Sequence, residues 1–114
     1  MTDLMPPRID EQALEEKAAE AASFLRSLAN KHRLMVLCSL VAGERSVGEL
    51  NDGLGLTPSN LSRHLAMLRE EGLVATRRGG TTIYYRIASD RVKPLLGALY
   101  DLFCADTATR YRRN

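Results

Sequence analysis

The sequence predicts a mainly α-helical domain that carries one β-hairpin, and three observations lead to this fold class. Apolar residues recur at spacings of three and four over much of the chain, which is the period of an amphipathic helix. Two short helical segments flank a glycine-containing corner, residues 53–57, of the size found in helix-turn-helix motifs. Two alternating segments rich in β-forming residues then surround Gly79 and Gly80, which is typical of a tight hairpin. This order of helices and hairpin is that of a winged helix-turn-helix.

The 114 residues provide room for one domain, since single domains commonly contain about 100–150 residues. The two cysteines are too few for a disulfide scaffold, and no apolar run approaches the roughly 18–20 residues that span a bilayer. The first ten residues lack a basic and apolar leader, so we expect no signal peptide. We also expect no membrane partner, and a location in the reducing cytoplasm, where the two cysteines are thiols. We expect a flexible lead over residues 1–9, a folded domain over residues 10–110 and a basic tail over residues 111–114.

Capping residues and apolar stripes predict the first two helices. Asp10 is suited to cap the first helix, and Asn30 to cap a second helix over Lys31–Val41 that Gly43 ends. The stripe of the first helix is Leu14, Ala18, Ala21, Leu25 and Leu28. The shared apolar face of the second helix is Leu34, Leu37, Cys38 and Val41.

The next two helices carry clearer start signals. Ser46 and Glu49 form a capping-box pattern, in which the carboxylate reaches back to the backbone N–H of Ser46. Thr57 is placed to cap a fourth helix that has Pro58 at its first position, where a missing N–H is harmless, and Gly72 ends it. The buried stripe of this fourth helix is Leu61, Leu65 and Leu68.

The predicted hairpin consists of strands over residues 73–78 and 82–87, joined by the Gly-Gly-Thr turn at residues 79–81. Tyr84 and Tyr85 alternate along the second strand, so one side chain should pack inward and the other should face outward. A last helix follows shortly afterwards. Its broad apolar face is Val92, Leu95, Leu96, Leu99, Leu102 and Phe103.

The distribution of charge indicates where a nucleic acid would bind. The 16 Lys+Arg and 14 Asp+Glu leave a net charge of only +2, which by itself does not indicate a nucleic-acid binder. Residues 1–30, however, carry three basic and six acidic groups, whereas residues 55–93 carry seven basic and three acidic groups. The positive segment is typical of a phosphate-binding surface, with a solvated basic face as the alternative.

In a winged helix-turn-helix the second helix of the motif lies in the major groove. Arg63 can donate two hydrogen bonds to a guanine edge there, and Asn60 can pair with adenine. The alternatives are a helix-capping role for Ser59 and a solvated position for Arg63. The basic hairpin, with Arg86 among its residues, suits the DNA backbone or the minor groove. The candidate DNA contacts are Ser59, Asn60, Ser62, Arg63, His64, Arg77, Arg78, Thr81 and Tyr85.

No pattern in the sequence is typical of an enzyme. A thiol oxidoreductase would carry Cys-x-x-Cys at a helix start in a βαβ context, and neither feature is present. The sequence shows no Ser-His-Asp order and no glycine-rich phosphate loop. We therefore expect a DNA-binding regulator without enzymatic activity and without a cofactor.

Three segments resemble the ArsR/SmtB family of bacterial repressors. They are residues 24–34 (FLRSLANKHRL), residues 46–50 (SVGEL) and residues 57–74 (TPSNLSRHLAMLREEGLV), and the resemblance covers about residues 14–104. It implies a homodimer that forms through the first and last helices and binds double-stranded operator DNA. It also implies that an inducer at an allosteric site weakens this binding.

The sequence departs from the metal sensors of that family. The family's third-helix site uses a Cys-x-Cys motif, but the stretch from Ser46 to Asp52 contains neither Cys nor His. The last-helix site uses Asp-x-His, whereas Asp90-Arg91-Val92 lacks the histidine, and no histidine follows it. We therefore expect no metal site, and a metal- or metalloid-responsive repressor is the second hypothesis.

The two cysteines lie in the predicted second helix, Cys38, and near the end of the last helix, Cys104. By themselves, two free cysteines are most simply small hydrophobic core residues. The resemblance extends, however, to a dithiol subgroup of the family, and it implies a disulfide or polysulfide switch between these thiols that a persulfide or an oxidant triggers. Direct repression and activation by displacement of a silencer both remain open.

Overall fold

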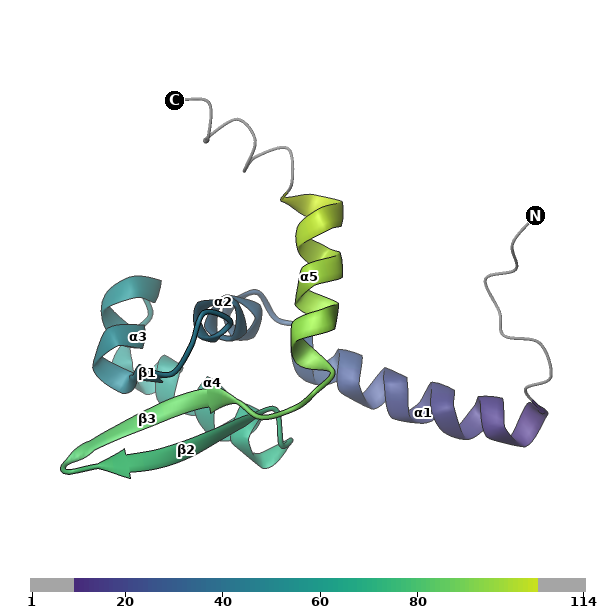
Figure 1. The fold of residues 1–114 in the computed structure, drawn as a ribbon, viewed down its shortest axis with the longest axis horizontal. Coiled ribbons are helices and arrows are strands. Elements are labelled where there is room, and N and C mark those ends of the chain that lie inside the picture. The colour runs from purple at the N-terminus through teal and green to yellow at the C-terminus, as the bar shows by residue number, and fades with distance from the viewer. Residues whose placement is uncertain (1–9, 105–114) are drawn as a thin grey trace.

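The computed structural model describes residues 10–104, which form five helices and a small antiparallel sheet in the order expected for a winged helix-turn-helix (Figure 1). The expected lead over residues 1–9, the tail over residues 111–114 and the end of the predicted domain lie outside the described residues. The elements are α1 (Glu11–Leu28), α2 (Lys31–Leu40), β1 (Arg45–Ser46), α3 (Val47–Leu54), α4 (Pro58–Glu70), β2 (Val74–Gly79), β3 (Thr82–Ile87) and α5 (Val92–Phe103).

Four of the five helices begin at a residue whose side chain accepts a hydrogen bond from the first turn. Asp10 accepts from the N–H of Ala13 at 2.7 Å, and Asn30 accepts from the first turn of α2. Ser46 and Glu49 form both bonds of the predicted capping box. The fourth helix starts at Thr57, as expected from the sequence. These caps confirm the predicted helix starts because each one depends only on local chemistry.

The sheet has the strand order β1-β3-β2. Gly79 pairs with Thr82, so the hairpin turn contains only Gly80 and Thr81, and Gly80 has a φ of 67°, which favours glycine. Sequence reasoning missed β1, in which Arg45 pairs with Tyr85. A strand of two residues is too short to show an alternating pattern.

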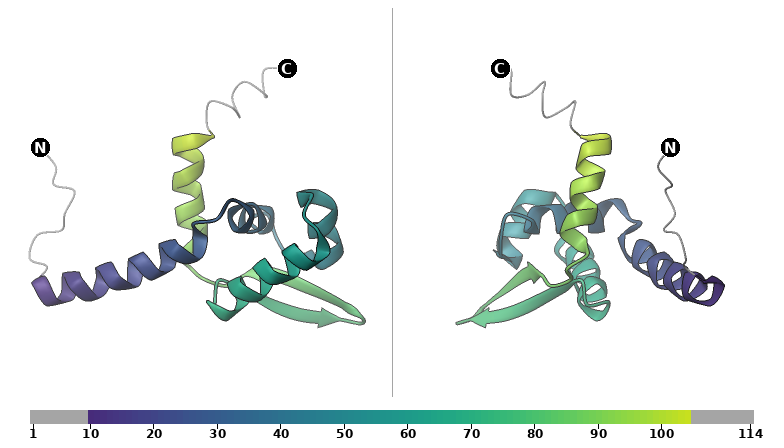
Figure 2. Two further views of the ribbon diagram at one scale, coloured as in Figure 1. Left: turned by 180° about the vertical axis from the view of Figure 1, so that it is seen from behind. Right: turned by 45° about the vertical axis from the view of Figure 1, so that its right-hand side comes forward.

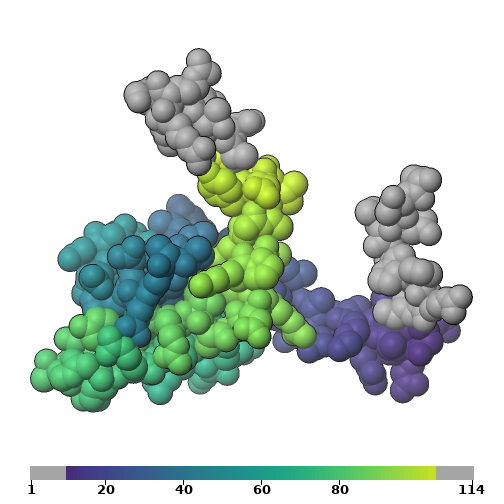
Figure 3. Space-filling view, in the orientation of Figure 1, coloured from purple at the N-terminus to yellow at the C-terminus, as the bar shows by residue number. Residues whose placement is uncertain are grey.

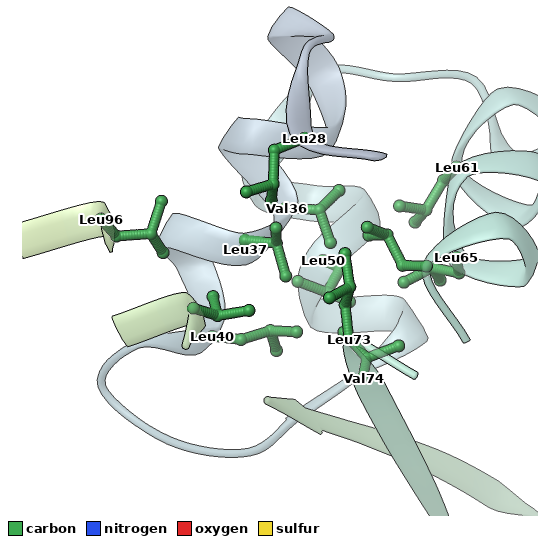
Figure 4. Close-up of a cluster of buried hydrophobic side chains, with 12 residues drawn as sticks. Leu28, Val36, Leu37, Leu40, Leu50, Leu61, Leu65, Leu73, Val74 and Leu96 are labelled. Atoms are coloured by element: carbon green, nitrogen blue, oxygen red, sulfur yellow. The ribbon is translucent and has the colours of Figure 1, made fainter. Parts of the chain in front are cut away.

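The core lies between α2, α3, α4 and the base of the hairpin (Figure 4). Its buried side chains are Leu28, Val36, Leu37, Leu40, Leu50, Leu61, Leu65, Leu68, Leu73, Val74, Val92 and Leu96. The α4 stripe is thereby confirmed. The predicted α2 face is only partly correct, because α2 buries Val36 and Leu40 as well as Leu37, whereas Cys38 and Val41 are exposed and lie toward α5.

Two helices extend away from this core. Figure 2 shows α1 projecting to one side of the body and α5 rising from it, and the space-filling view shows both as separate arms (Figure 3). The α1 helix buries only Leu28, and α5 buries only Val92 and Leu96. No helix among the described residues combines the length and the apolar character that crossing a membrane requires.

Candidate nucleic-acid interface and thiol pair

The outer face of α4 presents short polar side chains. The helix follows a corner at which Gly55 adopts a left-handed conformation with a φ of 68°, and its leucine stripe faces the core. Ser59, Asn60, Ser62 and Arg63 are all exposed. Arg63 Nη2 donates a hydrogen bond to Asn60 Oδ1 at 3.2 Å, so these two predicted base-reading side chains form one linked pair on the surface.

His64 lies at the edge of this face, in the contact between α4 and α2. It is half-buried, and its ring centroid lies 5.8 Å from that of His32. Burial and the nearby charges of Arg33, His32 and Arg63 lower the pKa of His64 below its ordinary value. The lowered pKa favours the neutral form of the imidazole, and the contact of His64 with DNA stays a prediction.

The hairpin arginines occupy two different environments. Arg78 and Arg86 are exposed, as is Thr81 at the turn. Arg77, in contrast, forms an ion pair with Glu44, and its guanidinium carbon lies 4.5 Å from the centroid of the Tyr84 ring. The bond to the Glu44 carboxylate raises the pKa of Arg77. Sequence reasoning missed this role of Glu44, because the two residues are 33 positions apart.

Tyr85 points in the opposite direction from Tyr84 and packs against the core, which confirms the expected alternation of the two tyrosines. It borders a hollow of about 490 Å³ between the hairpin and α4. The other residues that line this hollow are Val47, Ser62, Leu65, Ala66, Arg69 and Glu70. Tyr85 therefore has a packing role, and its predicted contact with DNA stays a prediction. Arg69 is a cation on this surface that sequence reasoning did not select.

The two thiols lie together between α2 and α5. Cys38, in the middle of α2, and Cys104, directly after α5, are both free and exposed, so neither is a core residue. Both line one hollow of about 320 Å³. Burial and the nearby charge of Cys104 raise the pKa of the Cys38 thiol. Cys38 and Cys104 are far apart in the sequence, and the fold brings this predicted pair to one site.

Among residues 10–104, no three His, Cys, Asp or Glu side chains gather into a set that could hold a metal ion. The two histidines face each other across α2 and α4, and the arginines whose charges act on His64 make that site unfavourable for a cation.

Large apolar side chains are exposed on the two projecting helices. On α5, Leu102 and Phe103 are 76% and 75% exposed, and Tyr100 is also exposed. On α1, Leu14 and Leu25 are exposed in the same way. Exposed apolar side chains of this size on two projecting helices are typical of surfaces that another protein chain covers.

Known proteins resemble this chain over most of its length. Residues 30–76 match the family model described as "Bacterial regulatory protein, arsR family". The biofilm growth-associated repressor of Xylella fastidiosa (strain 9a5c) is 42% identical over 92% of each chain. The transcriptional activator HlyU of Vibrio cholerae is 44% identical, over 82% of this chain and 86% of its own.

Solved structures of other proteins share the fold of this chain. The structure of reduced HlyU from Vibrio cholerae has a TM-score of 0.77 and covers 82% of this chain and 98% of its own, at 44% identity. A homodimeric winged helix-turn-helix DNA-binding domain from Mycobacterium bovis has a TM-score of 0.66 and 34% identity, and covers 86% of this chain and 89% of its own.

Proposed function

Because the chain belongs to the ArsR family of bacterial transcriptional regulators, we propose that it is a homodimeric repressor that a thiol switch releases from operator DNA. The family consists of DNA-binding regulators and not of enzymes, as the sequence predicted. The observation that carries the proposal is that Cys38 and Cys104 line the same hollow. Oxidation or persulfidation of these thiols is the proposed signal.

The exposed face of α4 supports the DNA-binding role. Asn60 and Arg63 lie on the outer side of the helix that a winged helix-turn-helix places in the major groove. An arginine can donate two hydrogen bonds to a guanine edge, and an asparagine can donate one hydrogen bond to adenine N7 and accept one from adenine N6. Arg78 and Arg86 on the hairpin are the proposed phosphate contacts, since both are exposed cations.

The projecting helices support the homodimer. The exposed apolar side chains of α1 and α5 would be buried by a second copy of this chain, and the Mycobacterium bovis neighbour is a homodimer of the same fold. Two copies would present two α4 helices to successive major grooves. Half-sites of such operators are spaced about one helical turn apart, so binding depends on the distance between the two helices.

The thiol chemistry proceeds in two balanced steps. One thiolate attacks the outer sulfur of a persulfide R–S–SH, forms Cys–S–SH and releases R–S⁻. The second thiolate then attacks the Sγ atom of the first cysteine, closes a disulfide and releases HS⁻. If both cysteines carry an added sulfur, the same attack by Cys–S–S⁻ gives a trisulfide and HS⁻. A peroxide instead gives a sulfenic acid, which the second thiolate converts to the disulfide with loss of hydroxide.

The bridge would act on DNA through the dimer. It joins α2, which packs in the core, to the end of α5, which belongs to the proposed dimer surface. A shift of α5 relative to the core changes the distance between the two α4 helices. The required coupling is modest, on the order of 1–3 kcal/mol, which corresponds to a roughly 5–150-fold loss of affinity.

The test measures binding of the reduced protein to DNA from its own promoter region by fluorescence anisotropy, before and after treatment with a persulfide donor. We expect tight binding that the donor weakens at least about tenfold, within the range usual for such coupling. Cys38→Ser and Cys104→Ser should bind DNA like the reduced protein and should not respond. Loss of binding by the treated Cys38→Ser variant would overturn the dithiol mechanism, and no binding by the reduced protein would overturn the repressor.

The similarity to HlyU favours a second candidate, because that relative is named a transcriptional activator. In this case the same protein–DNA complex would displace a silencer instead of blocking transcription. Deletion of the gene separates the two candidates: transcription from the target promoter rises if the protein represses and falls if it activates.

A further inference from the structure

The hollow that contains both thiols has an almost entirely apolar lining. None of the seven residues around it is charged, and the phenol of Tyr100 is the only polar group besides the two thiols. The residues that complete the lining are Leu34, Leu96, Leu99 and Phe103. A molecule that reaches both sulfur atoms therefore loses contacts with water and gains contacts with apolar side chains.

A second hollow of about 420 Å³ is also lined by Cys38 and includes Lys93 and Asp101. Their opposite charges balance, so this hollow offers no net attraction to an anion. Cys104 does not line it. A ligand held there would reach Cys38 alone, whereas the apolar hollow gives access to both thiols at once.

On the basis of the thiol switch proposed above, we propose that the inducer is an uncharged sulfane-sulfur compound with an apolar body, of the dialkyl trisulfide class. Apolar groups gain free energy when leucine and phenylalanine side chains cover them. A charged body, such as the glutathione part of a glutathione trisulfide, loses hydration in the same place without gaining a partner. The hollow thus distinguishes sulfur donors by the groups attached to their sulfur atoms and not by the sulfur atoms themselves.

The reaction of a dialkyl trisulfide with the pair balances without another reactant. The Cys104 thiolate attacks a terminal sulfur of R–S–S–S–R, forms Cys104–S–S–R and releases R–S–S⁻. The Cys38 thiolate then attacks the Cys104 sulfur, forms the Cys38–Cys104 disulfide and releases R–S⁻. The two cysteines lose two electrons together, and the trisulfide gains them. Attack on the central sulfur leads instead to a bridging trisulfide and two R–S⁻.

The local electrostatics support this order of attack. The raised pKa of Cys38 lowers its thiolate fraction. One cause of that raised pKa is the negative charge of Cys104, and this charge disappears when Cys104 becomes a mixed disulfide. The first step therefore increases the thiolate fraction of Cys38, the group that performs the second step.

The test compares two donors that share the same three sulfur atoms, dipropyl trisulfide and glutathione trisulfide, on the reduced full chain. Intact mass follows the bridged product over time, and each rate is divided by the rate of the same donor with N-acetylcysteine. We expect the normalised rate of dipropyl trisulfide to be at least about tenfold higher, because a charged group resists transfer to an apolar site. Equal normalised rates, or a preference for glutathione trisulfide, would overturn the inferred inducer class.

Two variants of one residue supply a matched control. Leu34→Lys places a cation in the lining and should lower the preference for dipropyl trisulfide, whereas Leu34→Met keeps the lining apolar and should retain it. A preference unchanged in Leu34→Lys would count against the inference, and the wild-type comparison decides the question if that variant does not fold. If neither donor produces a bridge, the thiol switch itself fails, whereas bridges formed equally by both donors contradict only the inducer class.

Discussion

Glu44 holds Arg77 with both oxygen atoms of its carboxylate. Arg77 Nε lies 2.9 Å from Oε1 and 2.9 Å from Oε2, and Nη2 lies 2.8 Å from Oε1. The same guanidinium covers the ring of Tyr84. Arg77 therefore connects the turn before β1 to the hairpin, and its charge is already partnered by Glu44. Among residues 10–104, Arg78 and Arg86 form no such ion pair.

Replacement of Glu44 by Gln should strengthen DNA binding, because it releases Arg77 for a phosphate and removes a negative charge. We expect the slope of log affinity against log salt to become steeper by about 0.9, the contribution of one phosphate contact. Titrations at several salt concentrations measure this slope. Arg78→Gln should reduce it by a similar amount, and Arg77→Gln in the otherwise wild-type chain should leave it unchanged. A reduced slope in Arg77→Gln would show that Arg77 contacts DNA in spite of its partner.

The end of β2 should not tolerate a side chain at Gly79. A Cβ there would lie 2.9 Å from the ring of Tyr84 and 3.2 Å from Arg77 Nη1, so the ring would have to move. We expect Gly79→Ala to lower the free energy of unfolding by about 1 kcal/mol, the lower range for an overpacked site. Urea denaturation measures this change. Gly53→Ala, where no atom lies within 4 Å, should instead be neutral or stabilising, since alanine favours a helix.

The depressed pKa of His64 predicts how stability depends on pH. The unfolded chain takes up a proton near the ordinary value of 6.5, whereas the folded chain does so only at lower pH. This contribution to stability is complete above about pH 6.5, the unfolded value, and is lost as the pH falls through the folded pKa. The urea midpoint should therefore decline on acidification below that value, and His64→Gln should reduce the decline. An equal decline in both proteins would assign it to other groups.

Removal of one thiol should change the titration of the other. Since the charge of Cys104 is one cause of the raised pKa of Cys38, Cys104→Ser should lower that pKa. The rate of alkylation of Cys38 by iodoacetamide, measured against pH, should reach half of its maximum at a lower pH in the variant than in the wild-type chain. An unchanged profile would mean that burial alone determines the pKa and that the two sulfur atoms do not interact.

A charge on the exposed apolar end of α5 should separate the proposed dimer. We expect Leu102→Glu to sediment as a monomer at micromolar concentration and to lose most of its operator affinity, because a buried unpaired carboxylate is strongly unfavourable. Ile83→Glu alters another exposed apolar side chain, on the hairpin, and should remain a dimer. If Leu102→Glu remains a dimer, the interface between the two copies does not include this end of α5.

Local chemistry explains which features the sequence predicts well. Asp10, Asn30, Ser46 and Thr57 each start a helix by bonding to a backbone N–H two or three residues away, so neighbouring residues suffice for the prediction. The leucine stripe of α4 follows for the same reason, from a helical period on an otherwise polar segment.

Features that depend on distant residues could not be predicted in this way. The α2 helix is apolar on most of its sides, so periodicity does not show that Leu37 faces the core whereas Cys38 faces α5. The ion pair between Glu44 and Arg77 depends on how the hairpin folds back along β1, a strand too short to be recognised. The resemblance to the family paired the two cysteines, and the fold shows that they line one hollow.

The single buried side chain of α1 has a consequence for the cell. A helix of 18 residues that contributes only Leu28 to the core gains little of its stability from its own chain. If a second copy supplies the missing contacts, the fraction of ordered α1 increases with the amount of protein present. The abundance of the regulator then becomes a signal in its own right: below a threshold concentration the operator stays open even when both cysteines are reduced.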